Sequence, residues 1–265
     1  MKLPIVIANM VAEAYSADID RIVALLRPGC RLLFITGAGM SADSGLPTYR
    51  GIGGLYNAGV TEEGVTIEEA LAGSTLESRP ELAWKYLAQI GRAAMAATFN
   101  RGHQVIAEME DHFDHVCVLT QNIDGYHHQA GSRNVIDIHG DMHVLYCAAC
   151  GFRQTLDKMD SVEIPPLCPE CQAVLRPDVV LFGETLPWEK LSRLYQELDA
   201  GFDVVFSVGT TSVFPYIAEP VIMAHSLGWA TVEINPGKSK VSSLVDIRLF
   251  LGAAEALDAI WRRYR

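Results

Sequence analysis

The feature that most restricts the fold is an apolar run at residues 31–36 that leads directly into a glycine-rich stretch at 37–51. The run predicts a buried parallel strand, and α/β folds use such a junction to present backbone N–H groups to a phosphate. Gly37 and Gly39 permit a tight turn and a close backbone approach. Other side chains could cap a turn or bond a ribose or phosphate: Ser41, Ser44 and Arg50. The pattern G-x-G-x-x-A is an incomplete dinucleotide fingerprint, so an ordinary glycine-rich loop remains an alternative.

Later apolar runs also end in residues that can bind a ligand. Gln121, Asn122 and Asp124 follow the run 116–120, and His139 follows the run 135–138. Gly209 and Thr210 follow the run 203–208, and Asn235 follows the run 229–234. Because open parallel sheets bind ligands at the carboxyl ends of their strands, these residues predict one nucleotide-sized cleft. Asn122 and Asp124 could instead form an Asx turn, and His139 could be a general base or a structural histidine.

Four cysteines form the strongest local motif. Cys147 and Cys150 make one C-x-x-C pair, and Cys168 and Cys171 make another, in the spacing range of a tetrahedral zinc site. Two short disulfide loops are the alternative, but disulfides are rare in cytosolic chains and these would cross-link little. A closed four-cysteine site leaves no position for a catalytic water, so we predict a structural Zn²⁺ ion.

The remaining periodicity predicts a large α/β domain with a smaller one inserted. Helices are expected at 16–26, 66–72, 80–91, 101–111, 188–200, 215–227 and 253–264, with Ser16 capping the first. A strand at 175–182 should re-enter the large domain, and 246–251 should form a last short strand. We predict an α/β fold: a Rossmann-like doubly wound parallel sheet from residues 1–50, 101–140 and 178–265. The smaller domain combines a helical insertion with a cofactor loop at 51–100 and a zinc-ribbon module at 141–177.

Composition narrows the choice of partners. The 265 residues are 49% hydrophobic and carry a net charge of −11. No apolar run reaches the ~20 residues that a membrane span needs, and the first residues lack a clear signal-peptide cleavage site. We therefore expect a cytoplasmic protein with no membrane partner. The negative charge argues against binding to a nucleic-acid backbone and is compatible with cationic protein substrates.

Taken together, the motifs resemble those of the sirtuins, a family of NAD-dependent protein deacylases with bacterial members. The matching segments are 37–51, 120–124, His139-Gly140, the four cysteines, 182–184, 208–210 and 234–235. They occur in the family's order and extend from about residue 32 to the C-terminal helix. Each segment is weak evidence alone, but the set is highly specific.

The resemblance implies a reaction and a set of site residues. In the family, the carbonyl oxygen of an acyl-lysine attacks the ribose carbon that carries nicotinamide, nicotinamide leaves, and a histidine then deprotonates a ribose hydroxyl. Here His139 would be the base, and Asn122 and Asp124 would hold the nicotinamide end. The NAD contacts would come from Gly37, Ala38, Gly39, Ser41, Tyr49, Arg50, Gln121, Asn122, Ile123, Asp124, Gly209, Thr210, Thr211, Asn235, Pro236 and Ala253.

The resemblance also implies where the substrate protein binds. An acylated-lysine peptide would lie as an extra strand beside two segments, Gly183-Glu184 and Val213-Phe214. Its acyl group would enter an apolar tunnel that includes Val180 and Phe182. Two departures from the family pattern affect this region. Tyr49 replaces the usual Phe beside the nicotinamide pocket, and the segment 209–215 is one residue shorter than the common form.

A third departure bears on the acyl group. Family members that remove succinyl or malonyl groups carry a Tyr and an Arg three residues apart in the small-domain helix, where this chain has Leu87 and Ile90. A buried acyl carboxylate would be unpaired there and costly. We therefore expect acetyl or longer apolar acyl groups to be preferred over succinyl. Tyr86 and Arg92 could supply a weaker pair if the helix register were shifted.

Two other functions remain open. An NAD glycohydrolase or mono-ADP-ribosyltransferase would use the same cleft without an acyl-lysine tunnel, and would release nicotinamide with no acylated peptide present. A zinc-ribbon nucleic-acid-binding protein is a different class. Between the cysteine pairs, however, basic and acidic residues are mixed and form no basic patch: Arg153 and Lys158 with Asp157, Asp160 and Glu163. No motif indicates an oligomeric state or a natural substrate protein.

Overall fold

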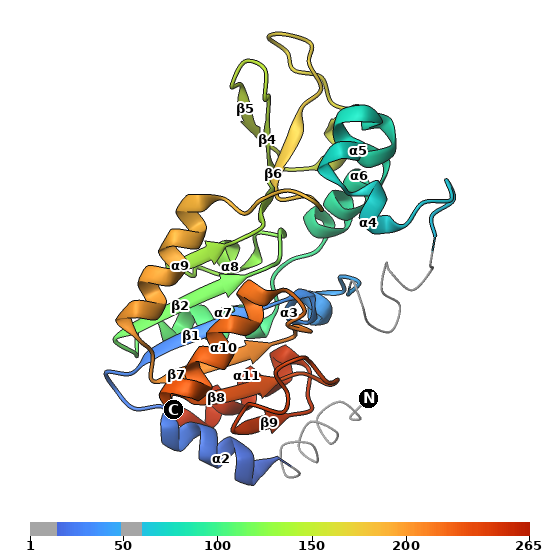
Figure 1. The fold of residues 1–265 in the computed structure, drawn as a ribbon. Helices are drawn as coiled ribbons and strands as arrows, with labels where there is room; N and C mark the ends of the chain where they lie inside the picture. The colour runs from blue at the N-terminus through green and yellow to red at the C-terminus, as the bar shows by residue number, and fades with distance from the viewer. Residues whose placement is uncertain (1–14, 49–59) are drawn as a thin grey trace.

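The computed structural model describes residues 15–48 and 60–265. Figure 1 shows a large α/β domain in its lower half and a smaller domain above it. The predictions for Tyr49 and Arg50, and for the glycine-rich segment up to residue 59, lie outside the described residues. Among the helices that are described, none is long and apolar enough to cross a membrane.

The large domain is built on a sheet of six parallel strands. In sheet order they are β3 (Val135–Asp137), β2 (His115–Thr120), β1 (Arg31–Thr36), β7 (Val204–Val208), β8 (Ala230–Ile234) and β9 (Ile247–Leu249). The central strands are buried almost throughout, as expected for continuous apolar runs between two helical layers. The predicted doubly wound parallel sheet is confirmed.

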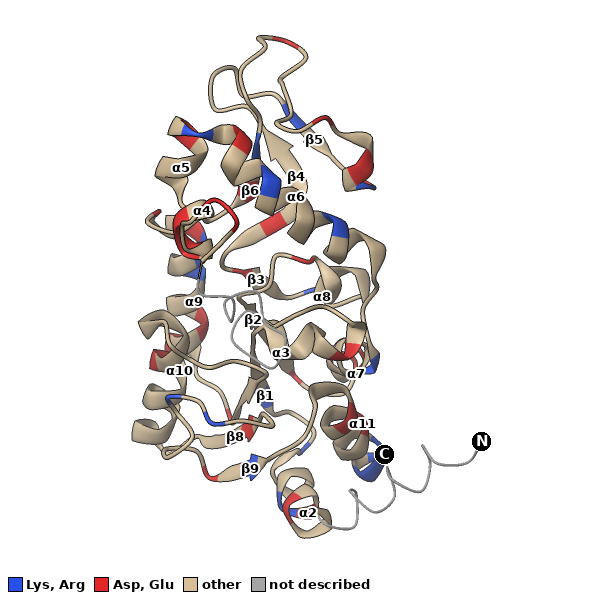
Figure 2. Ribbon diagram, turned by 90° about the vertical axis from the view of Figure 1, so that its right-hand side faces the viewer, with Lys and Arg blue, Asp and Glu red and all other residues tan. Residues whose placement is uncertain are grey.

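Helices cover both faces of this sheet. Helices α2 (Ser16–Leu25), α7 (Arg101–Met109) and α11 (Ala253–Tyr264) share a hydrophobic core with one face. Helices α9 (Trp188–Ala200) and α10 (Pro215–Leu227) share a core with the other. Figure 2 shows α9 and α10 on one side of the sheet and α7 and α11 on the other.

The helix predictions hold at nearly every position, but the predicted cap of α2 is wrong. The helix begins at Ser16 itself, Tyr15 precedes it, and no side chain caps it. The Ser16 hydroxyl instead accepts a hydrogen bond from Arg263 in α11 at 3.3 Å. The side chain of Ser16, which the local sequence predicts as a cap, therefore bonds to a residue far away in the sequence.

The sheet reverses its strand order between β1 and β7. From β1 the chain adds β2 and β3 on one side, and it later returns to add β7, β8 and β9 on the other. Open α/β sheets bind ligands at such a reversal, in the crevice at the carboxyl ends of the strands. The glycine-rich stretch lies at this crevice, where it forms two short helices, α3 (Ala38–Ser41) and η1 (Ala42–Ser44).

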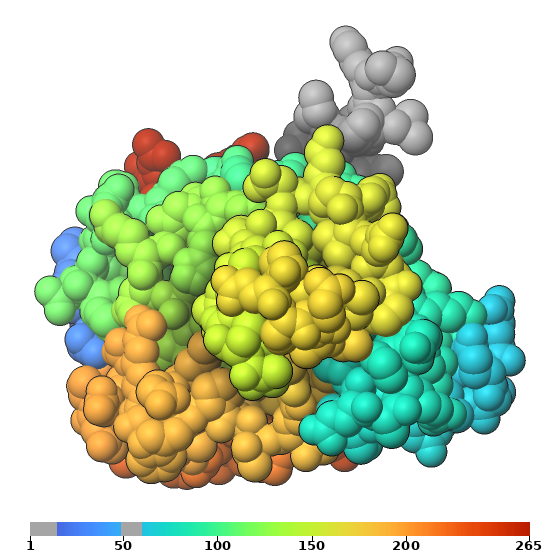
Figure 3. Space-filling view, turned by 90° about the horizontal axis from the view of Figure 1, so that it is seen from above, coloured from blue at the N-terminus to red at the C-terminus, as the bar shows by residue number. Residues whose placement is uncertain are grey.

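The smaller domain has a core of its own, to which both the ribbon and the helical insertion contribute. An antiparallel sheet of β5 (Arg153–Thr155), β4 (Gly140–Tyr146) and β6 (Arg176–Val179), with η3 (Met159–Ser161) beside it, packs against α4 (Ile67–Ala70), α5 (Gly73–Ser78) and α6 (Pro80–Ala96). Trp84 of α6 is fully buried and its Nε1 donates to the Leu175 carbonyl oxygen at 2.9 Å. Figure 3 shows the ribbon, in yellow, lying beside the insertion, in teal.

The expectation that a strand at 175–182 re-enters the large domain is wrong. β6 pairs antiparallel with β4, with Val179 opposite Gly140, and Phe182 forms an isolated parallel bridge with Ala72. An apolar run shows that a strand will be buried, but not which partner strand it will join, because that depends on residues far away in the sequence.

Candidate active site

The loops after β1 and β7 touch backbone to backbone. The Gly39 N–H donates to the Gly209 carbonyl oxygen at 2.8 Å, and the Gly37 N–H donates to the Val208 carbonyl oxygen at 3.1 Å. A Cβ on Gly39 would lie 2.6 Å from the Gly209 Cα, and a Cβ on Gly37 would lie 2.8 Å from the Thr210 Cβ. The close backbone approach that the sequence predicts is therefore present, and no side chain larger than hydrogen fits there.

Asn122 and Asp124, which follow β2, bond to this glycine-rich stretch. The Asn122 amide donates to the Gly37 carbonyl oxygen at 3.0 Å and to the Ser41 hydroxyl at 3.2 Å. The Ser41 hydroxyl donates to the Asp124 carboxylate at 2.6 Å and does not cap η1. Asp124 also accepts the Tyr126 N–H at 3.1 Å. The Asx turn that the sequence allowed is therefore present at Asp124, and the same carboxylate also bonds to the glycine-rich stretch.

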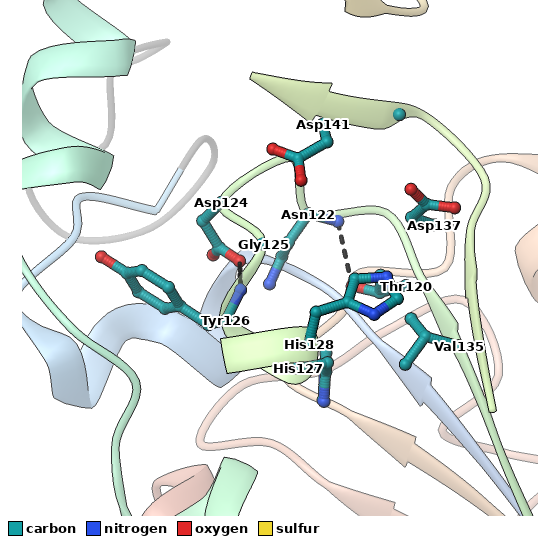
Figure 4. Close-up of a pocket in the computed structure, with 11 residues that line it drawn as sticks. Thr120, Asn122, Asp124, Gly125, Tyr126, His127, His128, Val135, Asp137 and Asp141 are labelled. Carbon is teal, nitrogen blue, oxygen red and sulfur yellow. Dashed lines mark hydrogen bonds between the residues drawn. The ribbon is translucent and has the colours of Figure 1, made fainter. Parts of the chain in front are cut away.

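Burial determines the electrostatics of this cluster. Asp124 is only 6% exposed, and burial raises the pKa of its carboxyl because the charged form loses its hydration. Figure 4 shows a small pocket here, with Asp124 on one side and Asp137 and Asp141 around it. The pocket residues come from the ends of β2 and β3, from α8 (Tyr126–Gln129) and from β4. Both domains therefore contribute to this part of the site.

The ends of β7 and β8 extend the same network. The Gln121 side chain donates to the Thr210 hydroxyl at 2.8 Å, and the Asn235 amide donates to the Thr210 carbonyl oxygen at 2.8 Å. The Gly209 N–H donates to the Ile234 carbonyl oxygen at 2.9 Å. Of the other predicted cofactor residues, Ala38 and Ile123 are half-buried, Thr211 and Pro236 are exposed, and Ala253 is buried at the start of α11.

His139 lies where the chain passes from the large sheet into the smaller domain. Its Nδ1 is 2.9 Å from the Gln121 carbonyl oxygen, and its Nε2 is 2.6 Å from the Tyr216 hydroxyl. Burial lowers the pKa of the imidazole because the charged form loses hydration. The next residue, Gly140, has φ +91° and its Cβ would lie 1.9 Å from the Asp178 carbonyl oxygen. The backbone at this junction therefore requires a glycine directly after His139.

The residues predicted to bind an acylated peptide approach His139 from two segments. The Val180 N–H donates to the His139 carbonyl oxygen at 2.8 Å, and the Phe214 ring meets the imidazole edge-on at 5.9 Å. Both oxygens of the Glu184 carboxylate accept hydrogen bonds from Arg176, at 2.7 and 2.8 Å. The other predicted residues are partly or fully exposed: Phe182, Gly183 and Val213.

The four cysteines converge at the far end of the ribbon. All four sulfur atoms lie within 4.8 Å of one another, with Cys147 and Cys171 at 3.4 Å and Cys150 and Cys168 at 3.6 Å. These separations are too long for disulfides and close to the roughly 3.8 Å between thiolates that share a tetrahedral Zn²⁺ ion. The donor set therefore fits structural zinc. Cys30 and Cys117 lie outside the cluster and are buried free thiols.

Comparison with known proteins identifies the fold family. The sequence profile of the Sir2 family matches residues 37–215, which make up more than half of the chain. This chain belongs to the Sir2 family. NAD-dependent protein deacylase 2 of Pseudomonas aeruginosa is 52% identical over 245 residues, covering 91% of this chain and 94% of the relative. The NAD-dependent protein deacylase of Aquifex aeolicus is 36% identical over 230 residues, covering 87% and 93%.

Solved Sir2 structures match this Sir2-family protein over nearly its full length. A complex of a Sir2 homologue with NAD is 34% identical, covers 93% of each chain and has a TM-score of 0.81. A Sir2 homologue variant bound to ADP-ribose is 33% identical, covers 92% of this chain and 96% of its own, and has a TM-score of 0.83.

Sequence reasoning missed one residue of this Sir2-family site. Tyr216 was expected only as part of the start of a helix, yet its hydroxyl bonds the imidazole of His139. The sequence offered one signal nearby: the segment 209–215 is one residue shorter than the family's common form. That signal predicted a change in the cleft but could not identify the residue that would fill it.

The contact between the two glycine loops gives a first prediction for this Sir2-family protein. Gly39→Ala should lower the free energy of unfolding by roughly 1–3 kcal/mol, as overpacking does in well-packed interiors, because the new methyl group meets backbone that cannot rotate away. Thermal and denaturant unfolding measure the loss. Gly237→Ala is the matched control, since its Cβ would lie 3.7 Å from the nearest atom. Equal stability of the two variants would contradict the argument.

The cysteine cluster predicts one bound Zn²⁺ ion per chain. Cys171→Ser removes one thiolate, so it should abolish stoichiometric zinc and destabilise the three-stranded sheet, because the metal contributes directly to folding. Atomic absorption measures the zinc content, and circular dichroism measures the thermal transition. Cys30→Ala, which removes a buried thiol outside the cluster, should keep its zinc. Protein that is free of zinc and carries two disulfides would contradict this prediction.

Proposed function

We propose that this protein is an NAD-dependent protein-lysine deacylase that transfers the acyl group of a modified lysine to ADP-ribose and releases nicotinamide. One observation carries the proposal: His139 is bonded to Gln121, and Gln121 is bonded to Thr210 at the glycine crevice. Hydrogen bonds therefore connect the imidazole, through Gln121, to the glycine-rich loops at the carboxyl ends of β1 and β7. The names of the bacterial relatives and the NAD complex of a Sir2 homologue support this reading.

The chemistry of the strand ends suits a pyridine dinucleotide. Gly37, Gly39 and Gly209 let the two loops pack through bare backbone, and a strand that runs into glycines is where α/β folds present backbone N–H groups to a pyrophosphate. Asn122 and Asp124 provide buried polar groups for the nicotinamide end, and Thr210 and Asn235 provide polar groups for the adenosine half. When bound, NAD supplies the ADP-ribose that accepts the acyl group.

His139 is suited to act as the general base. Because a carbonyl oxygen can only accept, Nδ1 carries the proton that bonds to Gln121, and Nε2 keeps the lone pair. Burial favours the neutral imidazole. The Gln121 carbonyl stabilises the imidazolium after Nε2 takes a proton, since Nδ1 still donates to it. The residue is therefore oriented and held in the tautomer that deprotonation of a hydroxyl needs.

The small-domain helix supports a preference for apolar acyl groups. Leu87 is 1% exposed and part of the smaller core, and Ile90 packs against that core. The nearby Tyr86 bonds Glu63 at 2.5 Å, and Arg92 bonds Asp160 at 2.8 Å. Those partners draw the two side chains toward other carboxylates, which opposes a joint role in binding a succinyl group. We propose acetyl or a longer apolar acyl group as the substrate.

The cellular setting follows from the same chemistry. Four thiolate ligands and two buried free thiols are compatible with a reducing compartment, where disulfides rarely persist. We therefore propose a cytoplasmic location and cytoplasmic protein substrates. The peptide would lie beside Val180 and Phe214, since both residues contact His139.

The deacylation assay tests this proposal. Acetyl-, longer acyl- and succinyl-lysine peptides are incubated with and without NAD, and the products are identified by mass spectrometry. We expect NAD-dependent removal of acetyl or apolar acyl groups, slower removal of succinyl, and a loss of roughly 10²–10⁴-fold in His139→Ala, the usual contribution of a general base. Nicotinamide release that does not need an acylated peptide would instead favour an NAD glycohydrolase or ADP-ribosyltransferase.

The pH dependence of kcat/KM tests the role of the imidazole. The base must be neutral, so activity should fall as the pH falls through the pKa of His139, which burial places below the ordinary value of about 6.5. Burial also lowers the pKa of His103 to about 4, and it lowers the pKa of His127 well below its ordinary value. These two groups stabilise the fold above the unfolded-state pKa, and that stability is lost as the pH falls. Circular dichroism at each pH therefore serves as the control, and an acid limb above pH 7 would contradict the role.

A further inference from the structure

The two hydrogen bonds of His139 determine the direction of the proton in each. The Gln121 carbonyl oxygen has no proton to give, so Nδ1 is the donor to it at 2.9 Å. In a neutral imidazole the other nitrogen, Nε2, then carries only a lone pair. Tyr216 lies 2.6 Å from that nitrogen, so its hydroxyl donates to Nε2. The atom that must accept the substrate proton is therefore already hydrogen-bonded.

Tyr216 is held in this position by the residues around it. It lies in the first turn of α10, and its ring stacks on Phe214 with centroids 5.6 Å apart and planes at 13°. Both rings meet the His139 imidazole edge-on, at 5.8 and 5.9 Å. Burial raises the pKa of Tyr216 to about 12, so the phenol keeps its proton at neutral pH. The donor is therefore both oriented and protonated.

We propose that Tyr216 is a positioning residue that gates the base: its hydroxyl occupies the Nε2 lone pair in the ligand-free protein and must leave before a substrate hydroxyl can be deprotonated. An imidazole nitrogen has one in-plane lone pair and accepts one good hydrogen bond. A ribose hydroxyl and the phenol consequently compete for one atom. When the phenol leaves, Nε2 takes the proton of the substrate hydroxyl, and Nδ1–H stays on Gln121.

The gate is adjacent to the segment expected to hold the acylated peptide. Val213 and Phe214 immediately precede the turn that carries Tyr216, and Val213 is 41% exposed. A peptide strand that pairs with this segment would displace the stacked ring and release Nε2. Binding of the peptide would in this way prepare the base. The inference rests on the proposed function, which makes His139 the base.

The first test does not depend on activity. NMR titration of the histidines in the ligand-free protein, with His139 assigned by its loss in His139→Gln, compares wild type with Tyr216→Phe. A hydrogen bond to the neutral imidazole lowers its pKa, so removing the hydroxyl should raise the protonation constant of His139 by roughly two- to tenfold, the usual strength of one such bond. Within the described residues, Lys190 also lowers this pKa, and it is paired with Asp137 at 2.9 Å, away from the substituted hydroxyl.

Tyr195→Phe is the matched control. Tyr195 lies on the neighbouring α9, and its hydroxyl donates at the surface to Glu219 of α10, whereas the hydroxyl that bonds His139 is that of Tyr216. Loss of the Tyr195 hydroxyl should therefore leave the titration of His139 unchanged. A Tyr216→Phe protein in which His139 titrates as in wild type would overturn the proposal. The Tyr216→Phe variant keeps the aromatic ring and therefore the stack on Phe214.

Phe214→Leu is a second variant, which removes the stacking partner of Tyr216 but keeps the Tyr216 hydroxyl. It should also raise the protonation constant of His139.

Kinetics provide the second readout. If the phenol competes with the substrate hydroxyl, Tyr216→Phe should raise kcat/KM for deacylation by roughly two- to tenfold, the factor expected for one lost hydrogen bond. It should also shift the acid limb of kcat/KM upward with the NMR titration. A well-folded variant with tenfold lower activity would instead make Tyr216 a proton relay and overturn the gate. Absence of deacylation in wild type would refute the proposed function while leaving the NMR result interpretable.

Discussion

The site depends on the contact between two backbones at the reversal of the sheet. Gly39 and Gly209 lie so close that a Cβ on Gly39 would sit 2.6 Å from the Gly209 Cα. This contact joins the loop after β1 to the loop after β7, and the two halves of the sheet thereby present their strand ends to one crevice. At the same place Asn122 donates to the Gly37 carbonyl oxygen, and the Gln121 side chain donates to the Thr210 hydroxyl. Bulkier residues at the reversal would separate these groups.

Burial then sets the protonation states that the chemistry needs. It favours the neutral form of both Asp124 and His139, raising the first pKa and lowering the second. The Gln121 carbonyl oxygen selects the tautomer of His139 by accepting the Nδ1 proton. The imidazole also lies at the junction of the two domains, where Gly140 begins β4 and Asp178 of β6 passes within contact distance. Any relative movement of the domains would therefore act directly on the base.

Local patterns predicted most of the elements because each one depends on neighbours in the chain. The helices at 188–200 and 253–264 have the predicted bounds, and the apolar runs that end in polar residues form the parallel sheet. Prediction was wrong where a distant partner decided the outcome. Arg263 donates a hydrogen bond to the hydroxyl of Ser16, and β4 pairs with the strand at Arg176–Val179. In both cases the local preference was weak and the long-range contact was specific.

By itself, the sequence determined the chemistry of each segment: two C-x-x-C pairs, glycines where backbone must pass, and a histidine at a strand end. These features are local, since they follow from spacing, backbone freedom and the period of the apolar residues. Only the tertiary structure decided which segments meet. It placed Tyr216 on the lone pair of His139, 77 residues away in the chain. Hydrogen-bond pairing over such separations depends on how the whole chain packs, and no short motif encodes it.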